Sequence, residues 1–178
     1  MKQMNDNDLG LQVKLLGHFE AWRNDEPLPP QAWPQRKTQT LLKILLTERG
    51  RIFTQDQLID ALFPDLDPDN ATQNLYKQIS ELRRTLEPNL NRGTDSQFVL
   101  RVGGGYCFSE NAPCWIDTKA FHQHVESARE LEQAGRWSQA LEQYQQSIEL
   151  YRGDYLAEDL YEEWSIPPRE HWRELYLT

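Results

Sequence analysis

An amphipathic segment from Asn70 to Leu86, NATQNLYKQISELRRTL, is the feature that most constrains the fold. Leu75, Ile79 and Leu82 continue to Leu86 at steps of four, three and four residues, the spacing that lines one face of an α-helix. Amide and charged side chains fill the opposite face. That face is either an ordinary solvated surface or a surface that reads the groove of a nucleic acid. For this segment alone, the solvated surface is the simpler interpretation, because such faces are common.

Two further helices are predicted before this one. Residues 34–50, PQRKTQTLLKILLTERG, start with a proline and end with a glycine, as many helices do. Thr54 and Gln57 form the capping-box pattern that opens a second helix. A polar loop interrupted by prolines, PDLDPDN, then leads to the amphipathic helix, for which Asp69 or Asn70 is the expected cap.

Segments that favour β-structure flank the three helices. Residues 11–22, LQVKLLGHFEAW, predict a strand or a hairpin arm, and RNDEPLPPQAW fits turns and short edge strands. FVLRVGGGYCFSE places three glycines between two β-favouring runs, which is typical of a β-hairpin. Strands, three helices and a hairpin, in this order, predict an α+β winged helix-turn-helix domain over residues 1–110, with the hairpin as the wing.

The second half, residues 111–178, is predicted to be all-α. Asp117 can cap a helix that runs to about Ala134 and ends at Gly135. RWSQALEQYQQSIELYR gives a second helix, and SIPPREHWRELYLT begins a third. Small and aromatic residues fall where an antiparallel hairpin of the tetratricopeptide kind has them, at Ala128, Ala140, Tyr144 and Ser147. Because such solenoids normally take about three repeats, we expect the helical domain to be truncated and the chain to be a fragment of a longer protein.

Charge is distributed unevenly along the chain. Residues 1–110 hold 13 Lys and Arg against 15 Asp and Glu, a net charge of −2, whereas residues 111–178 hold 6 against 13, a net charge of −7. Overall acidity therefore leaves the first half free to bind an anionic partner and argues against DNA contacts by the second half. The N-terminus has no signal-peptide pattern, and no apolar run is long enough to span a bilayer, so a cytoplasmic protein without a membrane partner is predicted.

No catalytic constellation is evident, so we predict that the chain is not an enzyme and uses no cofactor or metal. The four histidines are scattered along the chain, at His18, His122, His124 and His171. The glycine triplet lies inside a hairpin, whereas a nucleotide-binding loop lies between a strand and a helix. Cys107 and Cys114 lack the paired spacing of a zinc site, and two cytosolic thiols are expected to be reduced and structural.

The amphipathic helix supplies what a helix in the major groove requires, namely an apolar anchoring face, donors for base edges and cations for phosphates. By their positions, Lys77 and Gln78 can reach base edges, and Gln73 and Asn74 lie near the start of the helix. Arg83 and Arg84 can pair with phosphate or guanine.

The wing and the first helix add further candidate contacts. Arg101 and the segment from Gly103 to Tyr106 can form a wing tip against the minor groove or the DNA backbone. A glycine-rich turn with a core tyrosine is the simpler interpretation of that hairpin alone. Arg36 and Lys37 can contact phosphate at the start of the first helix, although by themselves they are ordinary surface cations.

In combination, these stretches resemble the SARP family of AfsR-like bacterial transcriptional activators, which join an OmpR/PhoB-type winged helix to a bacterial transcriptional activator domain. The stretches that carry the resemblance span nearly the whole chain in the family's order: WPQRKTQTLLKILLTERGRIFTQDQLIDALFPD, NLYKQISELRRTLEP, GGGYCF, CWIDTKAF and ALEQYQQSIELYRGDYLAEDLYEEW. The resemblance implies that the third helix reads DNA, with these residues on the contact surface of that helix and of the wing: Gln73, Asn74, Lys77, Gln78, Glu81, Arg83, Arg84, Arg101 and Tyr106.

One position departs from the family pattern. Many relatives have arginine where this chain has Glu81. An acidic side chain there would repel phosphate but could accept a hydrogen bond from cytosine, so the base preference of the relatives does not carry over.

The resemblance implies a sequence-specific regulator that binds double-stranded DNA and acts as an activator by recruiting RNA polymerase. The expected sites are direct repeats in promoters, occupied by tandem or dimeric protein in the bacterial cytoplasm and nucleoid. The loop PDLDPDN would lie where related regulators contact the polymerase. A competing hypothesis is a protein-interaction module, in which the acidic helical domain binds a partner and the winged helix is a scaffold.

Overall fold

The computed structural model describes residues 10–178, which form two compact units. One unit contains the chain up to Pro27 together with Cys114–Thr178, and the other is Leu28–Pro113. The predicted division between residues 110 and 111 assigned the N-terminal strands to the winged helix, whereas the contacts group them with the helices of the second half. The segment MKQMNDNDL, to which the prediction of no signal peptide applies, lies outside the described residues.

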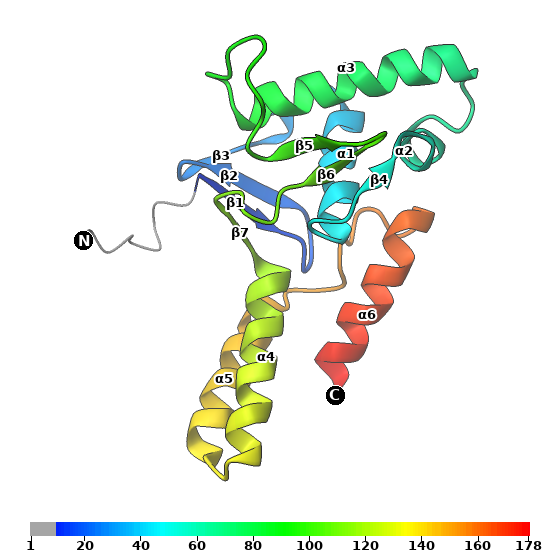
Figure 1. Cartoon of the computed structure of the whole chain (residues 1–178). Helices are drawn as coiled ribbons and strands as arrows, with labels where there is room; N and C mark the ends of the chain where they lie inside the picture. The colour runs from blue at the N-terminus through cyan, green and yellow to red at the C-terminus, as the bar shows by residue number, and fades with distance from the viewer. Residues whose placement is uncertain (1–9) are drawn as a thin grey trace. The chain divides into compact units, whose positions relative to one another are not determined.

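Three helices build most of the unit Leu28–Pro113 (Figure 1). They are α1 (Arg36–Thr47), α2 (Gln55–Leu62) and α3 (Pro68–Leu86), and a short 3-10 turn, η1 (Pro30–Ala32), precedes them. The capping box predicted before α2 is confirmed: the Thr54 hydroxyl accepts the Gln57 N–H at 3.2 Å, and the Gln57 side chain accepts the Thr54 N–H at 3.0 Å.

Helix α3 begins earlier than the sequence pattern predicts. Its N-cap is Asp67, whose carboxylate accepts the Asn70 N–H at 3.1 Å, and Pro68 occupies the first helical turn. Proline suits that position because the first N–H groups of a helix have no partner within it. Asp69 and Asn70, the predicted caps, therefore already lie inside the helix. The hydrogen bonds from Asn70 also hold the pKa of the Asp67 carboxyl below its usual value.

The apolar stripe predicted along α3 is confirmed and anchors the helix. Leu75, Ile79, Leu82 and Leu86 are all buried, none more than 4% exposed. They face the buried leucines of α1, a helix in which residues 41–46 form a continuous buried run. Each such side chain contributes roughly 1.5–3 kcal/mol through its removal from water. The outer face of α3 is therefore fixed in direction by the core beneath it.

A small antiparallel sheet completes this unit. Its strand order is β4 (Phe53–Thr54), β6 (Gly105–Phe108) and β5 (Val99–Val102). The hairpin formed by β5 and β6 is the one predicted from the glycine triplet. Gly103 has a φ of +57° at its turn, a backbone conformation that side chains with a Cβ rarely adopt.

The other unit contains a four-stranded sheet in the order β3-β2-β1-β7. Three of its strands are N-terminal, β1 (Leu11–Lys14), β2 (Glu20–Arg23) and β3 (Glu26–Pro27), and they pair antiparallel. Strand β7 (Cys114–Ile116) pairs parallel to β1, with Val13 opposite Ile116. This strand was not predicted, because three residues after a proline carry too little pattern to mark a strand.

Three helices follow β7 in the same unit (Figure 1). Helix α4 (Asp117–Gln133) and helix α5 (Trp137–Leu150) form the predicted hairpin, and the short turn η2 (Glu163–Ser165) leads into α6 (Ile166–Leu177). Three of the residues at the predicted small positions are buried in that hairpin: Ala128, Ala140 and Ser147. The fold class, a winged helix followed by a helical domain, is confirmed.

Asp117 has a different role from the predicted helix cap. The cap position is Ile116, and Asp117 is the first helical residue. Its buried carboxylate accepts the N–H groups of Leu15, at 2.8 and 2.9 Å, and of Leu16, at 2.9 Å. It therefore joins the end of β1 to the start of α4, two segments about a hundred residues apart in sequence.

Both cysteines, Cys107 and Cys114, are buried, and neither forms a disulfide within the described residues. Burial raises the pKa of the Cys107 thiol, and the nearby Glu110 carboxylate adds to the effect. Within residues 10–178, no helix has both the length and the apolar character needed to cross a membrane.

Candidate nucleic-acid interface

The outer face of α3 presents several of the predicted contact residues to solvent. Gln73, Lys77 and Arg84 are exposed. Asn74 is half-buried, and its side-chain amide donates to the Asn70 carbonyl oxygen at 2.8 Å. These side chains lie on the face opposite the buried stripe, so they are available to a ligand that approaches the helix from outside.

Glu81 is held by neighbouring side chains. Only 18% of its side chain is exposed; one carboxylate oxygen lies 3.9 Å from Lys77 Nζ, and the other accepts the Thr38 hydroxyl at 3.3 Å. A carboxylate in this position reduces the net charge of the α3 face near Lys77. These two contacts use only part of the acceptor capacity of the carboxylate, which has about four lone-pair sites.

Gln78 corrects the sequence prediction. It was expected to reach base edges, but its side chain is fully buried between α3 and α1. Its carbonyl oxygen accepts the Thr38 hydroxyl at 2.6 Å, and its amide donates to the Gln35 side chain at 2.7 Å. Position 78 lies three residues after Leu75 and four before Leu82, so helical spacing places it beside the buried stripe. At the edge of the stripe, periodicity alone does not decide whether a side chain is buried or exposed.

Removing the Gln78 side chain is expected to destabilise this unit. Gln78→Ala leaves the buried Thr38 hydroxyl with a weaker set of acceptors and opens space between α1 and α3, so the free energy of unfolding should fall by about 1–3 kcal/mol. Urea unfolding followed by circular dichroism measures the change. Gln73→Ala, on the exposed face of the same helix, is the control and should change stability by less than about 0.5 kcal/mol. Equal losses in the two variants would contradict the bridging role of Gln78.

Arg83 positions the hairpin, and part of its guanidinium group is already engaged in hydrogen bonds. Its guanidinium donates twice to the Val99 carbonyl oxygen of β5, from Nε at 3.1 Å and from Nη2 at 2.9 Å. This pair of bonds ties the C-terminal half of α3 to the first strand of the hairpin. Arg83 was predicted to contact phosphate or guanine, and that contact would require the remaining nitrogen or a broken tie.

The two predicted wing residues differ in exposure. Tyr106 is 4% exposed in β6, so its ring is largely buried and offers little surface to a groove. Arg101, its partner in the β5–β6 register, is exposed. The structure thus leaves Arg101 as the hairpin residue able to contact an anion and corrects the prediction for Tyr106.

Arg36 and Lys37 lie exposed in the first turn of α1. The N-cap residue, Gln35, makes no side-chain cap, and Lys37 Nζ lies 5.7 Å from the centre of the Phe63 ring. Two cations beside uncapped N–H groups suit an anion.

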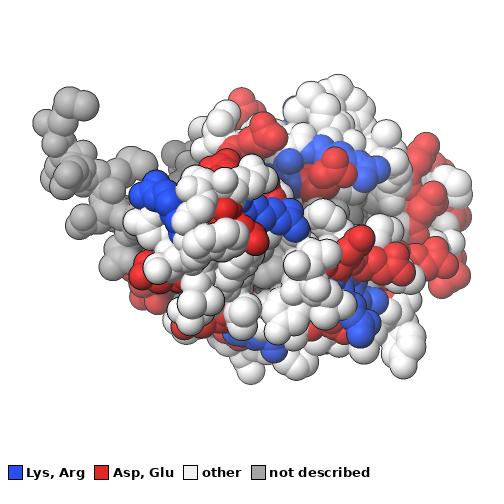
Figure 2. All heavy atoms as spheres, turned by 90° about the horizontal axis from the view of Figure 1, so that it is seen from below, with Lys and Arg blue, Asp and Glu red and all other residues white. Residues whose placement is uncertain are grey.

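Surface charge is mixed elsewhere. The face drawn in Figure 2 shows acidic side chains interspersed with Lys and Arg, without a broad basic patch among the described residues. The chain as a whole has a net charge of −9. A surface that contacts nucleic acid would therefore need several Lys or Arg side chains close together.

An α3 helix with an anchored apolar face and an exposed polar face, followed in sequence by a β-hairpin, defines the winged-helix class of DNA-binding domain. Comparison with family models gives the same class: residues 32–108 match the family described as "Transcriptional regulatory protein, C terminal". Residues 116–178 match the family described as "Bacterial transcriptional activator domain". These are families of transcriptional regulators, which generally have no enzyme activity. With these two domains in this order, the chain belongs to the SARP family of bacterial transcriptional activators.

Similar proteins are longer than this chain. The regulatory protein AfsR of Streptomyces coelicolor is 29% identical over 147 residues, which cover 83% of this chain and 14% of AfsR. The regulatory protein DnrI of Streptomyces peucetius is 26% identical over 151 residues, covering 83% of this chain and 54% of DnrI. The chain thus spans about half of DnrI and a smaller share of AfsR.

A solved structure of Mycobacterium tuberculosis EmbR, in complex with a low-affinity phosphopeptide, has the same fold. It superposes with a TM-score of 0.79 at 23% identity, over 94% of this chain and 43% of EmbR.

Proposed function

We propose that this chain is the DNA-binding and activating part of a sequence-specific regulator of transcription, with α3 as the helix that enters the major groove of double-stranded DNA. The observation that carries the proposal is the exposed row of Gln73, Lys77 and Arg84 on a helix fixed from behind by its buried stripe. Amide and cationic side chains on such a helix can donate to base edges and phosphates. Membership of the SARP family supports this proposal.

Different residues would have different tasks in the complex. Gln73 and Lys77 lie on the outer face of α3, in its first half and at its midpoint, and Asn74 lies at the edge of that face, so these three residues would face base edges. Other exposed cations would bind phosphates and set the position of the protein on DNA: Arg36, Lys37, Arg84 and Arg101. Arg83 would act by holding the hairpin in place.

The loop between α2 and α3 would contact RNA polymerase. Residues 64–70, which run from this loop into the first turn of α3, are all exposed, and they include Asp65, Asp67 and Asp69. An exposed acidic loop suits a basic partner surface. We further propose that the protein binds direct repeats in promoters as tandem or dimeric copies and that it acts in the bacterial cytoplasm on the nucleoid.

One observation favours the alternative, a protein-interaction module. On α5, Trp137, Leu141 and Ile148 are 64%, 58% and 55% exposed, and their spacing places them on one side of the helix. Large exposed apolar side chains in a row are typical of a surface that another protein covers. A chain that captures a protein partner but enriches no DNA sequence would support this alternative.

The function is tested by selection of genomic DNA fragments on the purified chain, followed by fluorescence anisotropy of the best fragment over a range of salt concentrations. A repeated sequence motif, with affinity that falls as salt rises, is the expected result. The spacing of the repeats would give the arrangement of the copies. Failure to enrich any sequence even at low salt would count against DNA reading by this chain.

Lys77→Ala is expected to weaken binding to the selected fragment by about 1–3 kcal/mol without unfolding the domain. Lys77 is exposed, and its only described ion pair is the 3.9 Å contact with Glu81, which contributes little in water. Anisotropy measures affinity, and circular dichroism confirms the fold. Unchanged affinity in both Lys77→Ala and Arg84→Ala would overturn the assignment of this face of α3.

A further inference from the structure

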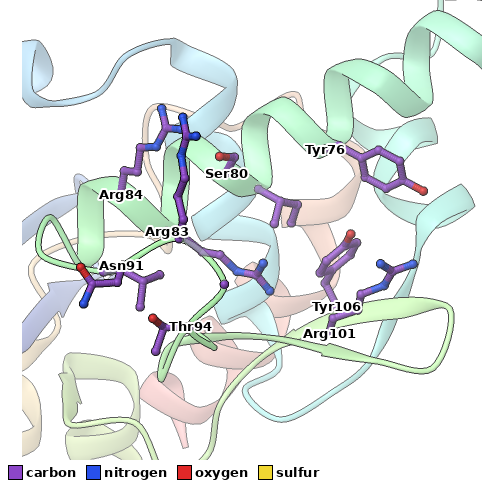
Figure 3. A pocket seen from close by; sticks show the side chains of 12 residues that line it. Tyr76, Ser80, Arg83, Arg84, Asn91, Thr94, Arg101 and Tyr106 are labelled. Carbon is purple, nitrogen blue, oxygen red and sulfur yellow. The ribbon is translucent and has the colours of Figure 1, made fainter.

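A cleft of about 410 Å³ opens between α3, the loop that follows it and the β5–β6 hairpin (Figure 3). Arg83 and Arg84 line it from α3, Arg101 from β5, and Arg92 from the loop. No Asp or Glu of the described chain lines this cleft. The loop and its arginine had no role in the sequence prediction.

The cleft is more basic than the unit to which it belongs. Residues 28–113 contain ten Lys and Arg and ten Asp and Glu, so the unit has no net charge, yet four of those ten cations line this one cleft. Arg84, Arg92 and Arg101 are exposed and make no ion pair or hydrogen bond with the described residues. Like charges brought together without a partner repel one another, so an anion bound between them would be favoured.

The loop that carries Arg92 is held by hydrogen bonds at its two ends. The Glu87 carboxylate accepts a hydrogen bond from the Ser96 hydroxyl and accepts the Gln97 N–H at 3.1 Å. Ser96 Oγ in turn accepts the N–H groups of Phe98, at 3.2 Å, and Val99, at 3.0 Å. The Glu87 carboxylate, at the start of the loop, is thus hydrogen-bonded within the loop and forms no described ion pair with the four arginines.

We infer that this cleft is a phosphate site that receives the backbone of the DNA strand passing between α3 and the hairpin, with Arg92 as a DNA contact contributed by the loop. The inference rests on the proposed function. If α3 lies in the major groove and the hairpin reaches the adjacent minor groove, one sugar-phosphate strand separates the two grooves and must pass between the two elements. The cleft is at that place, and the planar fork of arginine matches the geometry of phosphate oxygens.

The test compares the salt dependence of DNA binding in four versions of the 178-residue chain: wild type, Arg92→Ala, Arg92→Lys and Arg173→Ala. The probe is the fragment enriched by the wild-type chain. Arg92→Ala should weaken binding several-fold at low salt and make the slope of log affinity against log salt shallower by about 0.9, the change expected for one lost phosphate contact. Arg92→Lys should recover most of the slope. Arg173→Ala, which removes an exposed cation of α6 in the other unit, should leave it unchanged.

The outcomes separate this inference from the proposed function. If the wild-type chain binds DNA but Arg92→Ala keeps both its affinity and its slope, the phosphate site is wrong and the function stands. If the wild-type chain binds no DNA, the function itself fails and the inference with it. A uniform loss of affinity across fragments of different sequence is expected for Arg92→Ala, because a phosphate contact does not distinguish bases.

Discussion

Gly105→Ala is expected to lower the free energy of unfolding of the winged-helix unit by about 3 kcal/mol and to abolish high-affinity DNA binding. A Cβ at this position would overlap the Phe53 carbonyl oxygen and come within 2.9 Å of Ile52 Cγ2. Since that carbonyl is backbone in β4, which pairs with β6, no side-chain rotation can relieve the clash. The strands would have to separate, and the hairpin would lose its position beside α3.

Gly104→Ala is the matched control for this prediction. A Cβ added at the neighbouring Gly104 meets nothing within 4 Å, and its φ is not in the positive range. Thermal unfolding and DNA titration of the two variants side by side test the effect. If Gly105→Ala melts at the same temperature as Gly104→Ala and binds equally well, then the close approach of β4 and β6 does not determine the stability of the wing.

Asp117→Ala is expected to destabilise the other unit by about 2–4 kcal/mol. The substitution leaves the buried N–H groups of Leu15 and Leu16 without their acceptor, and each unsatisfied buried donor costs about 1–3 kcal/mol. Glu126→Ala is the control, since Glu126 forms an exposed pair with Arg129 at 3.0 Å that contributes about 1 kcal/mol at most. Urea unfolding curves give both values. A loss no greater than that of the control would contradict the role of Asp117.

Because of Asp117, we also expect the free energy of unfolding of this unit to depend on pH. Burial raises the pKa of the Asp117 carboxyl, although the N–H groups of Leu16 and Leu15 and the Arg152 guanidinium act in the opposite direction. Because its pKa in the folded protein exceeds that in the unfolded chain, the folded state binds the proton more tightly. Stability should therefore rise as pH falls through the raised pKa and be lost as pH rises through it.

The contribution of Asp117 can be separated from that of the other carboxyl groups by comparison with Asp117→Asn. Unfolding of both proteins is measured from about pH 7 down to about pH 4, the range above the ordinary pKa of aspartate. The wild type should gain stability relative to the variant as pH falls. A difference that stays constant across this range, or one that shrinks with acidification, would show that the pKa of Asp117 is not raised.

Local patterns were sufficient to predict most of the winged-helix elements. The steps between Leu75 and Leu86 define the buried side of α3, and Thr54 with Gln57 defines the start of α2, because the interactions involved span only a few residues. The cap at Asp67 was missed by two or three residues, because several acceptors in PDLDPDN compete for the cap position.

The side-chain contacts that could not be predicted from the sequence involve partners that lie far away along the chain. Gln78 is buried because Thr38, forty residues earlier, offers it a hydroxyl. Arg83 is tied to a strand that follows after a loop. Arg92 had no role in the sequence prediction, and only the folded arrangement places it in one cleft with three other arginines. The predictions that failed concern the direction of side chains next to the stripe, since periodicity cannot resolve the edge of a helix face.

The pairing of β7 with β1 makes the winged-helix unit an insertion within a discontinuous domain. Residues 28–113 lie in sequence between strands β3 and β7 of the same sheet. A protein cut after residue 110 would therefore keep β1 but lose β7, the strand that covers the edge of β1. An uncovered edge invites pairing between molecules. A fragment that starts near residue 28 should therefore give a better-behaved DNA-binding domain than one that retains residues 1–27. The helical domain should need these N-terminal strands supplied, in cis or as a separate peptide, to fold.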